Sequence, residues 1–127
     1  MSPLFRKSKK QVEQQAAAQA EIERLKLLSV DDLSVALLPC LGPDGANQGH
    51  SVRGQQVCNY LLRDFPGAGK LQPLLLMPRV NEALAMLKRA ELVSTISHQR
   101  SPVWRLTHLG KTLLAEGTIE QHVRKAR

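Results

Sequence analysis

Aromatic residues and cysteines are scarce in this chain of 127 residues. The aromatic residues are limited to Phe5, Tyr60, Phe65 and Trp104. The two cysteines, Cys40 and Cys58, are too few for a disulfide framework or for a zinc site built from cysteine alone. A reducing cytoplasm is therefore the expected compartment. A redox-sensing pair is the alternative for these two thiols, but Cys58 falls among apolar residues of a predicted helix, where a thiol is usually buried and inert.

Long apolar runs are also missing. No run approaches the roughly 20 residues that a bilayer-spanning helix needs, so we expect no membrane partner. The charged N-terminal segment is not followed by an apolar stretch, so the sequence predicts no secretory signal. Hydrophobic residues make up 43% and charged residues 23% of the chain, which is typical of a globular protein with one core.

Acidic residues are unevenly distributed, so the basic excess behind the net charge of +7 lies in three segments. Residues 1–10 hold four basic side chains and no acidic one, and residues 118–127 hold three basic side chains against Glu120. Residues 79–111 hold six basic and two acidic side chains. Clustered Lys and Arg favour a polyanionic partner when they share one face of the fold.

The first half of the chain is predicted to be helical. Residues 9–28 contain no Gly or Pro and are rich in Ala, Gln, Glu and Leu, which favours one helix with a weak apolar stripe. Ser29 has the character of an N-cap for a second helix that ends at Pro39. A third helix is expected over 51–64, and Pro78 suits the first turn of a fourth that ends near Glu91.

The pattern changes after the fourth helix. Residues 92–97 and 103–107 alternate and are rich in β-branched residues, which predicts two antiparallel strands with a hairpin tip at 98–102. Trp104 is expected in the core. Thr107 is the predicted N-cap of a last helix that Gly117 ends. The fold class is therefore mainly α with a small β-hairpin.

No residue pattern indicates an enzyme or a bound cofactor. The four histidines lack metal-ligand spacing. The segment 67–70 has the Gly and Lys of a phosphate loop, but Asp64 stands where the first Gly is needed and Leu71 where Ser or Thr should follow. Asp31 and Asp32 are adjacent and point in different directions on a helix, so they make a poor acid–base pair. We therefore predict no catalytic residue, cofactor or metal.

The segment VNEALAMLKRAELVSTISHQRSPVWRLTHLGKTLLAEG, residues 80–117, resembles the recognition helix, wing and following helix of MarR- and PadR-type bacterial transcriptional regulators. The apolar positions Leu84 and Leu87 and the W-R-L-T-x-L-G pattern at 104–110 carry the resemblance. It implies a winged helix-turn-helix that binds DNA. This chain departs from the family at Glu91, where a Gly is usual before Leu92. It also departs on the expected exposed helix face, because Glu82 repels phosphate and because Ala85 and Met86 offer no hydrogen bonds to base edges.

The resemblance implies that Arg79 and Asn81 enter the major groove, where Arg suits guanine and Asn suits adenine. The other basic side chains of the segment complete the expected DNA-binding set, which is Arg79, Asn81, Lys88, Arg89, Arg100, Arg105 and Lys111. Arg100, at the wing tip, is expected to contact phosphate or the minor groove.

The expected organisation is a disordered basic tail (1–8), an N-terminal helical extension (9–41), a winged-helix domain (50–117) and a basic C-terminal tail (118–127). Double-stranded DNA is the leading partner, and a homodimer formed through the 9–28 helix is a further expectation. The alternative is a winged helix that binds a protein or ribonucleoprotein without reading DNA sequence.

Overall fold

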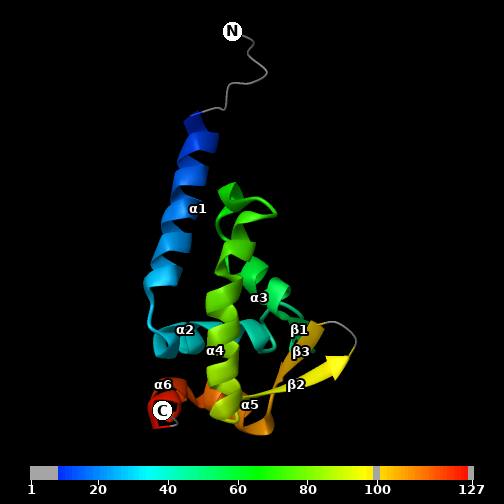
Figure 1. Ribbon diagram of the computed structural model, residues 1–127. Helices are drawn as coiled ribbons and strands as arrows, with labels where there is room; N and C mark the ends of the chain where they lie inside the picture. Colours follow the sequence, from blue (N-terminus) through cyan, green and yellow to red (C-terminus); the bar gives the residue numbers. More distant parts are fainter. Residues whose placement is uncertain (1–8, 99–100, 126–127) are drawn as a thin grey trace.

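The computed structural model describes residues 9–98 and 101–125, and it is mainly helical with a small antiparallel sheet (Figure 1). The α-helices are α1 (Lys9–Leu27), α2 (Val30–Leu37), α3 (Gly54–Leu61), α4 (Met77–Arg89), α5 (His108–Glu116) and α6 (Ile119–Lys125). Three short 3₁₀ helices are η2 (Leu38–Leu41), η3 (Pro66–Ala68) and η4 (Gln72–Leu76). The strands are β1 (Val52–Arg53), β2 (Val93–His98) and β3 (Ser101–Leu106). The tail expected at 1–8 lies outside the described residues.

The helices at the start of the chain form where the sequence predicts them. α1 buries Ala18, Ile22 and Leu25 and leaves most of its remaining surface in water. Ser29 caps α2, because its hydroxyl oxygen accepts a hydrogen bond of 3.1 Å from the backbone N–H of Asp32. This bond satisfies one of the amide groups that a helix start leaves without an intrahelical acceptor.

The second helix packs directly against α4. Ser34 is fully buried at the crossing, where its hydroxyl lies 2.7 Å from the carbonyl oxygen of Val30 in its own helix and 3.2 Å from that of Ala83. Leu33 and Leu37 are buried in the same core as Leu84. The region expected as an N-terminal helical extension (9–41) thus shares one hydrophobic core with the rest of the fold.

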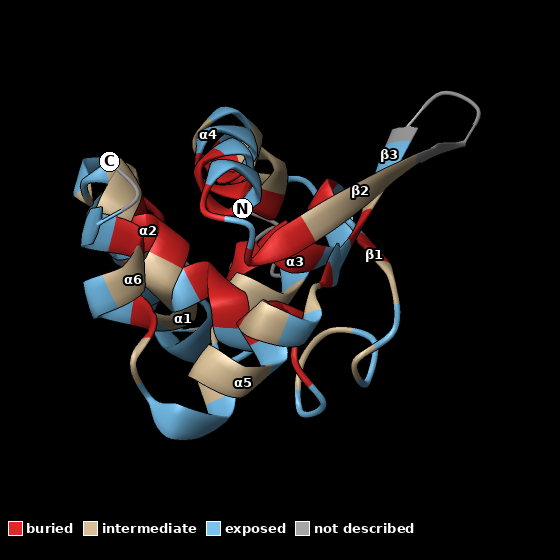
Figure 2. Ribbon diagram, turned by 90° about the horizontal axis from the view of Figure 1, so that it is seen from below, coloured by how far each residue is buried: buried red, intermediate tan, exposed pale blue. Residues whose placement is uncertain are grey.

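The sheet has the strand order β1-β3-β2, and the hairpin of β2 and β3 extends away from the helices (Figure 2). Trp104 pairs with Thr95 on one side and Val52 on the other, and it is only 9% exposed. Its predicted place in the core is confirmed. The helix expected from residue 51 begins only at Gly54, because Val52 is fully buried and pairs with β3 as a short strand.

The turn between α4 and β2 needs an unusual backbone. Glu91 has a φ of 64°, which is the left-handed region that the family resemblance assigns to Gly. The surrounding contacts fix it there: the Thr107 hydroxyl donates to the Glu91 carbonyl at 2.6 Å, and the Thr107 N–H donates to the Leu92 carbonyl at 3.0 Å. A non-glycine residue in this region costs about 1 kcal/mol, and the two hydrogen bonds from Thr107 offset that cost.

The C-terminal segment expected as a basic tail instead forms α6. Gly117 ends α5 in the left-handed conformation, and the chain turns back toward α2. Ile119 and Val123 lie four residues apart on one side of α6 and are buried. His122 Nε2 lies 3.0 Å from the carbonyl oxygen of Ala90 at the end of α4. The apolar spacing of Ile119 and Val123 was the signal for this helix.

The connection between α3 and α4 is long and packs against α1. It contains η3 and η4, whereas a helix-turn-helix usually has a turn of three or four residues. Gly67 allows the close approach, because a Cβ built there would lie 2.3 Å from the carbonyl carbon and oxygen of Gln14. Any side chain at this position would have to push α1 away.

We expect Glu91→Gly to raise the free energy of unfolding by about 1 kcal/mol, because glycine adopts positive φ without steric cost. Urea denaturation followed by circular dichroism measures the change. Glu13→Gly, at an exposed position inside α1, is the matched control and should lower stability by up to about 1 kcal/mol. Loss of stability in both variants would show that the Glu91 backbone is not strained.

We expect Gly67→Ala to lower the free energy of unfolding by about 1–3 kcal/mol, since the new methyl group would overlap the Gln14 backbone. Limited proteolysis should show faster cleavage within α1 in this variant. Lys70→Ala, at an exposed position three residues away, should leave both measurements unchanged. A Gly67→Ala protein as stable as the parent would contradict the close packing of η3 on α1.

Candidate nucleic-acid interface

The solvent side of α4 is a narrow surface of mixed polarity. Pro78 stands in the first turn, where its lack of an N–H costs no hydrogen bond. Val80, Ala83, Leu84 and Leu87 turn toward the core, as the spacing predicts. The side chains left exposed are those of Pro78, Asn81, Glu82, Ala85, Lys88 and Arg89.

Met86 does not belong to this exposed surface. The sequence placed it on the outer face of the helix, but it is only 4% exposed and packs in the core. Arg89 bends over it, with Nη2 lying 3.7 Å from the Met86 sulfur. The expected apolar patch of Ala85 and Met86 is therefore reduced to the single methyl group of Ala85.

Arg79 is half-buried and engaged by its own chain. Its guanidinium donates a hydrogen bond to the carbonyl oxygen of Leu28, in the turn between α1 and α2. It also forms an ion pair with Glu82, with Nη1 and Oε2 3.0 Å apart. Arg79 therefore holds the start of α4 against the α1–α2 turn, and it could reach a base only by giving up these contacts.

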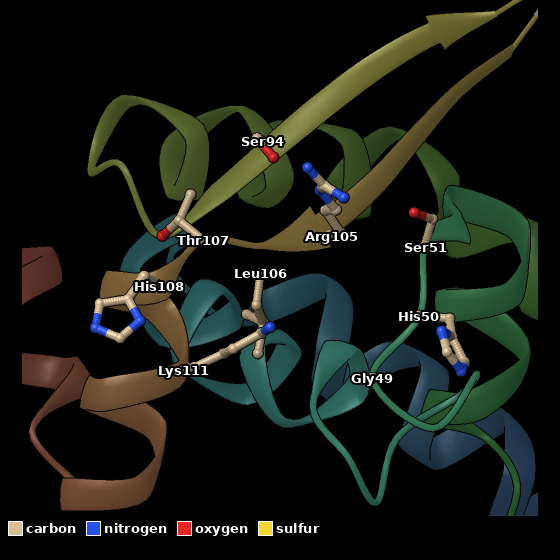
Figure 3. Close-up of a pocket in the computed structure, with 9 residues that line it drawn as sticks. All are labelled: Gly49, His50, Ser51, Ser94, Arg105, Leu106, Thr107, His108 and Lys111. Carbon is tan, nitrogen blue, oxygen red and sulfur yellow. The ribbon is translucent and has the colours of Figure 1, made fainter.

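A second surface rich in basic groups is a hollow of about 590 Å³ beside the hairpin (Figure 3). Loop 42–51, the base of the hairpin and the start of α5 contribute to its wall. The lining residues are Gly49, His50, Ser51, Ser94, Arg105, Leu106, Thr107, His108 and Lys111. Four of the nine carry basic side chains and none is acidic, so the hollow favours an anion over a cation.

Local structure explains how these side chains meet. Ser94 and Arg105 are paired across β2 and β3, so they project from the same face of the sheet. Thr107 caps α5 by accepting a 3.0 Å hydrogen bond from the Gly110 N–H, which places His108 and Lys111 in the first turn of that helix. The positive φ angles of Gln48 and Gly49 turn loop 42–51 back toward the sheet and bring His50 with it.

Apart from Arg79, which its own chain engages, the described residues of the predicted DNA-binding set divide into two groups. Asn81, Lys88 and Arg89 lie on the outer side of α4, and Arg105 and Lys111 line the hollow. In Figure 3 the hollow lies in front of the hairpin while α4 passes behind it, and Figure 2 places α4 and α5 on either side of β2. Arg100 lies outside the described residues.

Two residues of the hollow, His50 and His108, were not among the expected site residues. His108 follows the Thr107 N-cap, so its position next to Lys111 on the first turn of α5 could have been inferred. His50 belongs to a loop without periodic pattern, and nothing in the sequence indicates that this loop returns to β3.

Both cysteines are buried, as expected for inert thiols. Burial raises the pKa of the Cys40 thiol from 9.0 to about 11, and that of the Cys58 thiol to about 12. The Cys58 sulfur also lies 3.2 Å from the sulfur of Met77. Reactive thiolates are therefore rare at neutral pH.

Comparison with protein-family models, with curated proteins and with solved structures found no match to this chain. Within residues 9–98 and 101–125, no three His, Cys, Asp or Glu side chains come together to hold a metal ion. No helix in that part of the chain has the length and apolar character needed to cross a bilayer. The case for function consequently depends on the geometry of the two basic surfaces.

We expect both thiols to react with iodoacetamide at pH 8 at least about a hundredfold more slowly in the native protein than in urea, because burial holds them protonated. Since the folded pKa values are raised, the stability that the protonated thiols provide is present below pH 9 and is lost as the pH rises toward 12. Mass spectrometry of the alkylated protein gives the rates. Equal rates in the two states would contradict the buried positions.

Proposed function

We propose that this protein binds double-stranded DNA as a winged helix and acts as a transcriptional regulator. The order of α2, β1, α3, α4, β2 and β3, together with the sheet order β1-β3-β2, is compatible with that architecture. In helix-turn-helix proteins the second helix of the motif enters the major groove. The corresponding helix in this chain is α4.

The observation that carries the proposal is the set of exposed polar side chains on α4. Asn81 is a suitable partner for adenine through paired hydrogen bonds to N6 and N7. Lys88 and Arg89 lie in the last turn and are exposed, so they are placed to contact the phosphates that flank the groove.

The ion pair between Arg79 and Glu82 removes one objection to this proposal. An isolated carboxylate on a groove-binding helix would repel phosphate, and Glu82 is 53% exposed in its side chain. Arg79 lies 3.0 Å from that carboxylate and offsets its charge. An exposed ion pair of this kind adds little stability, but it makes the outer face of α4 net basic.

We expect Asn81→Ala to weaken binding to a selected duplex by about 1–3 kcal/mol and to affect a random duplex much less, because base contacts carry the specificity. The duplex is selected from a randomised library, and fluorescence anisotropy measures the affinities. If the parent protein binds the selected and the random duplex with equal affinity, sequence-specific regulation is contradicted.

We expect Lys88→Gln to weaken both duplexes alike and to lower the slope of log affinity against log salt by about 0.9, the value for one lost phosphate contact. The measurement is repeated between about 50 and 200 mM salt. Lys70→Gln is the control. Lys70 is exposed and lies outside α4, so this variant should leave the slope unchanged. A parent affinity that does not vary with salt would contradict phosphate binding.

A protein or ribonucleoprotein partner is the second candidate function, and exposed leucines favour it. Leu71 is 77% exposed and Leu75 is 52% exposed, and both lie in or beside η4, next to α1. Single exposed apolar residues are common, but two on one short turn are a suitable anchor for a protein surface. Retained DNA affinity in Leu71→Ser together with loss of a captured protein partner would assign this surface to protein binding.

The proposed homodimer through α1 would have to use what the chain leaves exposed. Ala18, Ile22 and Leu25 are already buried against this chain's own core, while Val12 is 52% exposed. Leu27, in the last turn, is 84% exposed, and Gln14 lies against Gly67 of η3. The surface open to a second copy is therefore the outer side of α1 along its whole length and not one half of it.

A further inference from the structure

The hollow beside the hairpin is not explained by a duplex seated on α4. Ser94 and Arg105 project from one face of the sheet, and the neighbouring pair of Thr95 and Trp104 projects from the other, toward the core. A duplex on the outer side of α4 would meet the hairpin from the side opposite the hollow (Figure 3). The basic side chains of the hollow would therefore stay uncovered by that duplex and open to another ligand.

The chemistry of the hollow favours a phosphate group. Arg105 and Lys111 are basic side chains with several N–H donors, and the rings of His50 and His108 offer further N–H donors. Hydroxyl groups of Ser51 and Ser94 can donate further hydrogen bonds. This number of donors exceeds what one carboxylate needs and matches the dianion of a phosphate monoester.

The start of α5 adds to the same preference. The hollow includes the N-cap Thr107 and the first helical residue, His108, so the first-turn amide groups of this nine-residue helix lie at its edge. Amide groups in the first turn of a helix lack intrahelical acceptors and favour an anion. This contribution supplements the four basic side chains and does not stand alone.

An adjoining pocket extends the hollow on its apolar side. It measures about 670 Å³ and shares Gly49, Leu106 and Lys111 with the hollow. Pro39, Pro43, Leu114 and Ala115 add apolar surface to it, and Asp44 is its acidic residue. A second anionic group is therefore disfavoured there, whereas an apolar or aromatic body fits. Each volume lies within the range of small-molecule sites.

We propose that the hollow and its adjoining pocket bind a small phosphate monoester with an apolar or aromatic body. The phosphate lies among Arg105, His108 and Lys111, and the body lies along Leu106 and Leu114. This site is independent of the proposed DNA surface, because it shares none of the exposed α4 side chains.

Titration of the full chain with phenyl phosphate and with inorganic phosphate, followed by isothermal calorimetry, tests the proposal. We expect saturable binding of both probes, with phenyl phosphate at least about tenfold tighter, because its ring adds apolar burial. Arg105→Gln and Lys111→Gln should each weaken phenyl phosphate at least about tenfold, as expected for a lost charged hydrogen bond. Both positions are exposed, so these variants should fold, and circular dichroism checks this.

Lys88→Gln is the matched control, because it removes the same charge from α4 and should leave phenyl phosphate affinity unchanged. Duplex binding should show the reverse, with loss in Lys88→Gln and retention in Lys111→Gln. Failure of DNA binding with phosphate binding intact would overturn only the proposed function. Absence of saturable phosphate binding, or equal loss in Lys88→Gln and Lys111→Gln, would overturn this inference. Displacement of phenyl phosphate by a duplex would also overturn it, since the hollow would then be a DNA phosphate contact.

Discussion

The crossing of α2 and α4 is the constraint on which the other features depend. Ser34 and Ala83 are small enough to let the two helices approach closely, and the Ser34 hydroxyl finds carbonyl acceptors in both helices. A larger residue at either position would separate the helices and expose the leucines that pack around them. One side of α4 packs against α2 and an adjacent side packs in the rest of the core, so only one face of α4 is exposed to water. The crossing therefore decides which residues of α4 are exposed, and the proposal that α4 is a DNA-recognition helix depends on those residues.

The hairpin has a different role, since it separates two surfaces. Its core face carries Trp104, whose burial fixes the register of β2 and β3 against β1. A slip of one residue would exchange Trp104 and Arg105 between the faces, placing a guanidinium in the core and an indole in the hollow. The same packing that stabilises the sheet therefore positions Arg105 beside His108 and Lys111. The hollow is thus a product of strand register as much as of its own residues.

Much of the local structure could be predicted from the sequence, because it depends on neighbours along the chain. The Ser29 and Thr107 caps, the first helix (expected over 9–28 and found over 9–27), the two hairpin strands and the helix end at Gly117 are confirmed. The hairpin tip expected at 98–102 is shorter, because β2 runs to His98 and β3 begins at Ser101. The misses depend on partners distant in sequence. Val52 is a strand residue only because Trp104 pairs with it, and Met86 is buried although its neighbour Ala85 is exposed. His50 enters the hollow through a loop with no periodic pattern.

Arg79 shows why a site inferred from residue type differs from one built by the fold. The sequence favours it as a base contact, since it opens the helix that resembles a recognition helix. The same position lies against the end of α1, where the Leu28 carbonyl needs a donor that the α1–α2 turn does not itself supply. A guanidinium has enough donors to satisfy that carbonyl and still pair with Glu82, whereas a lysine has a single ammonium centre for both tasks. Arg79 therefore holds α4 in place, and the proposed DNA contacts of the outer face are assigned to Asn81, Lys88 and Arg89 instead.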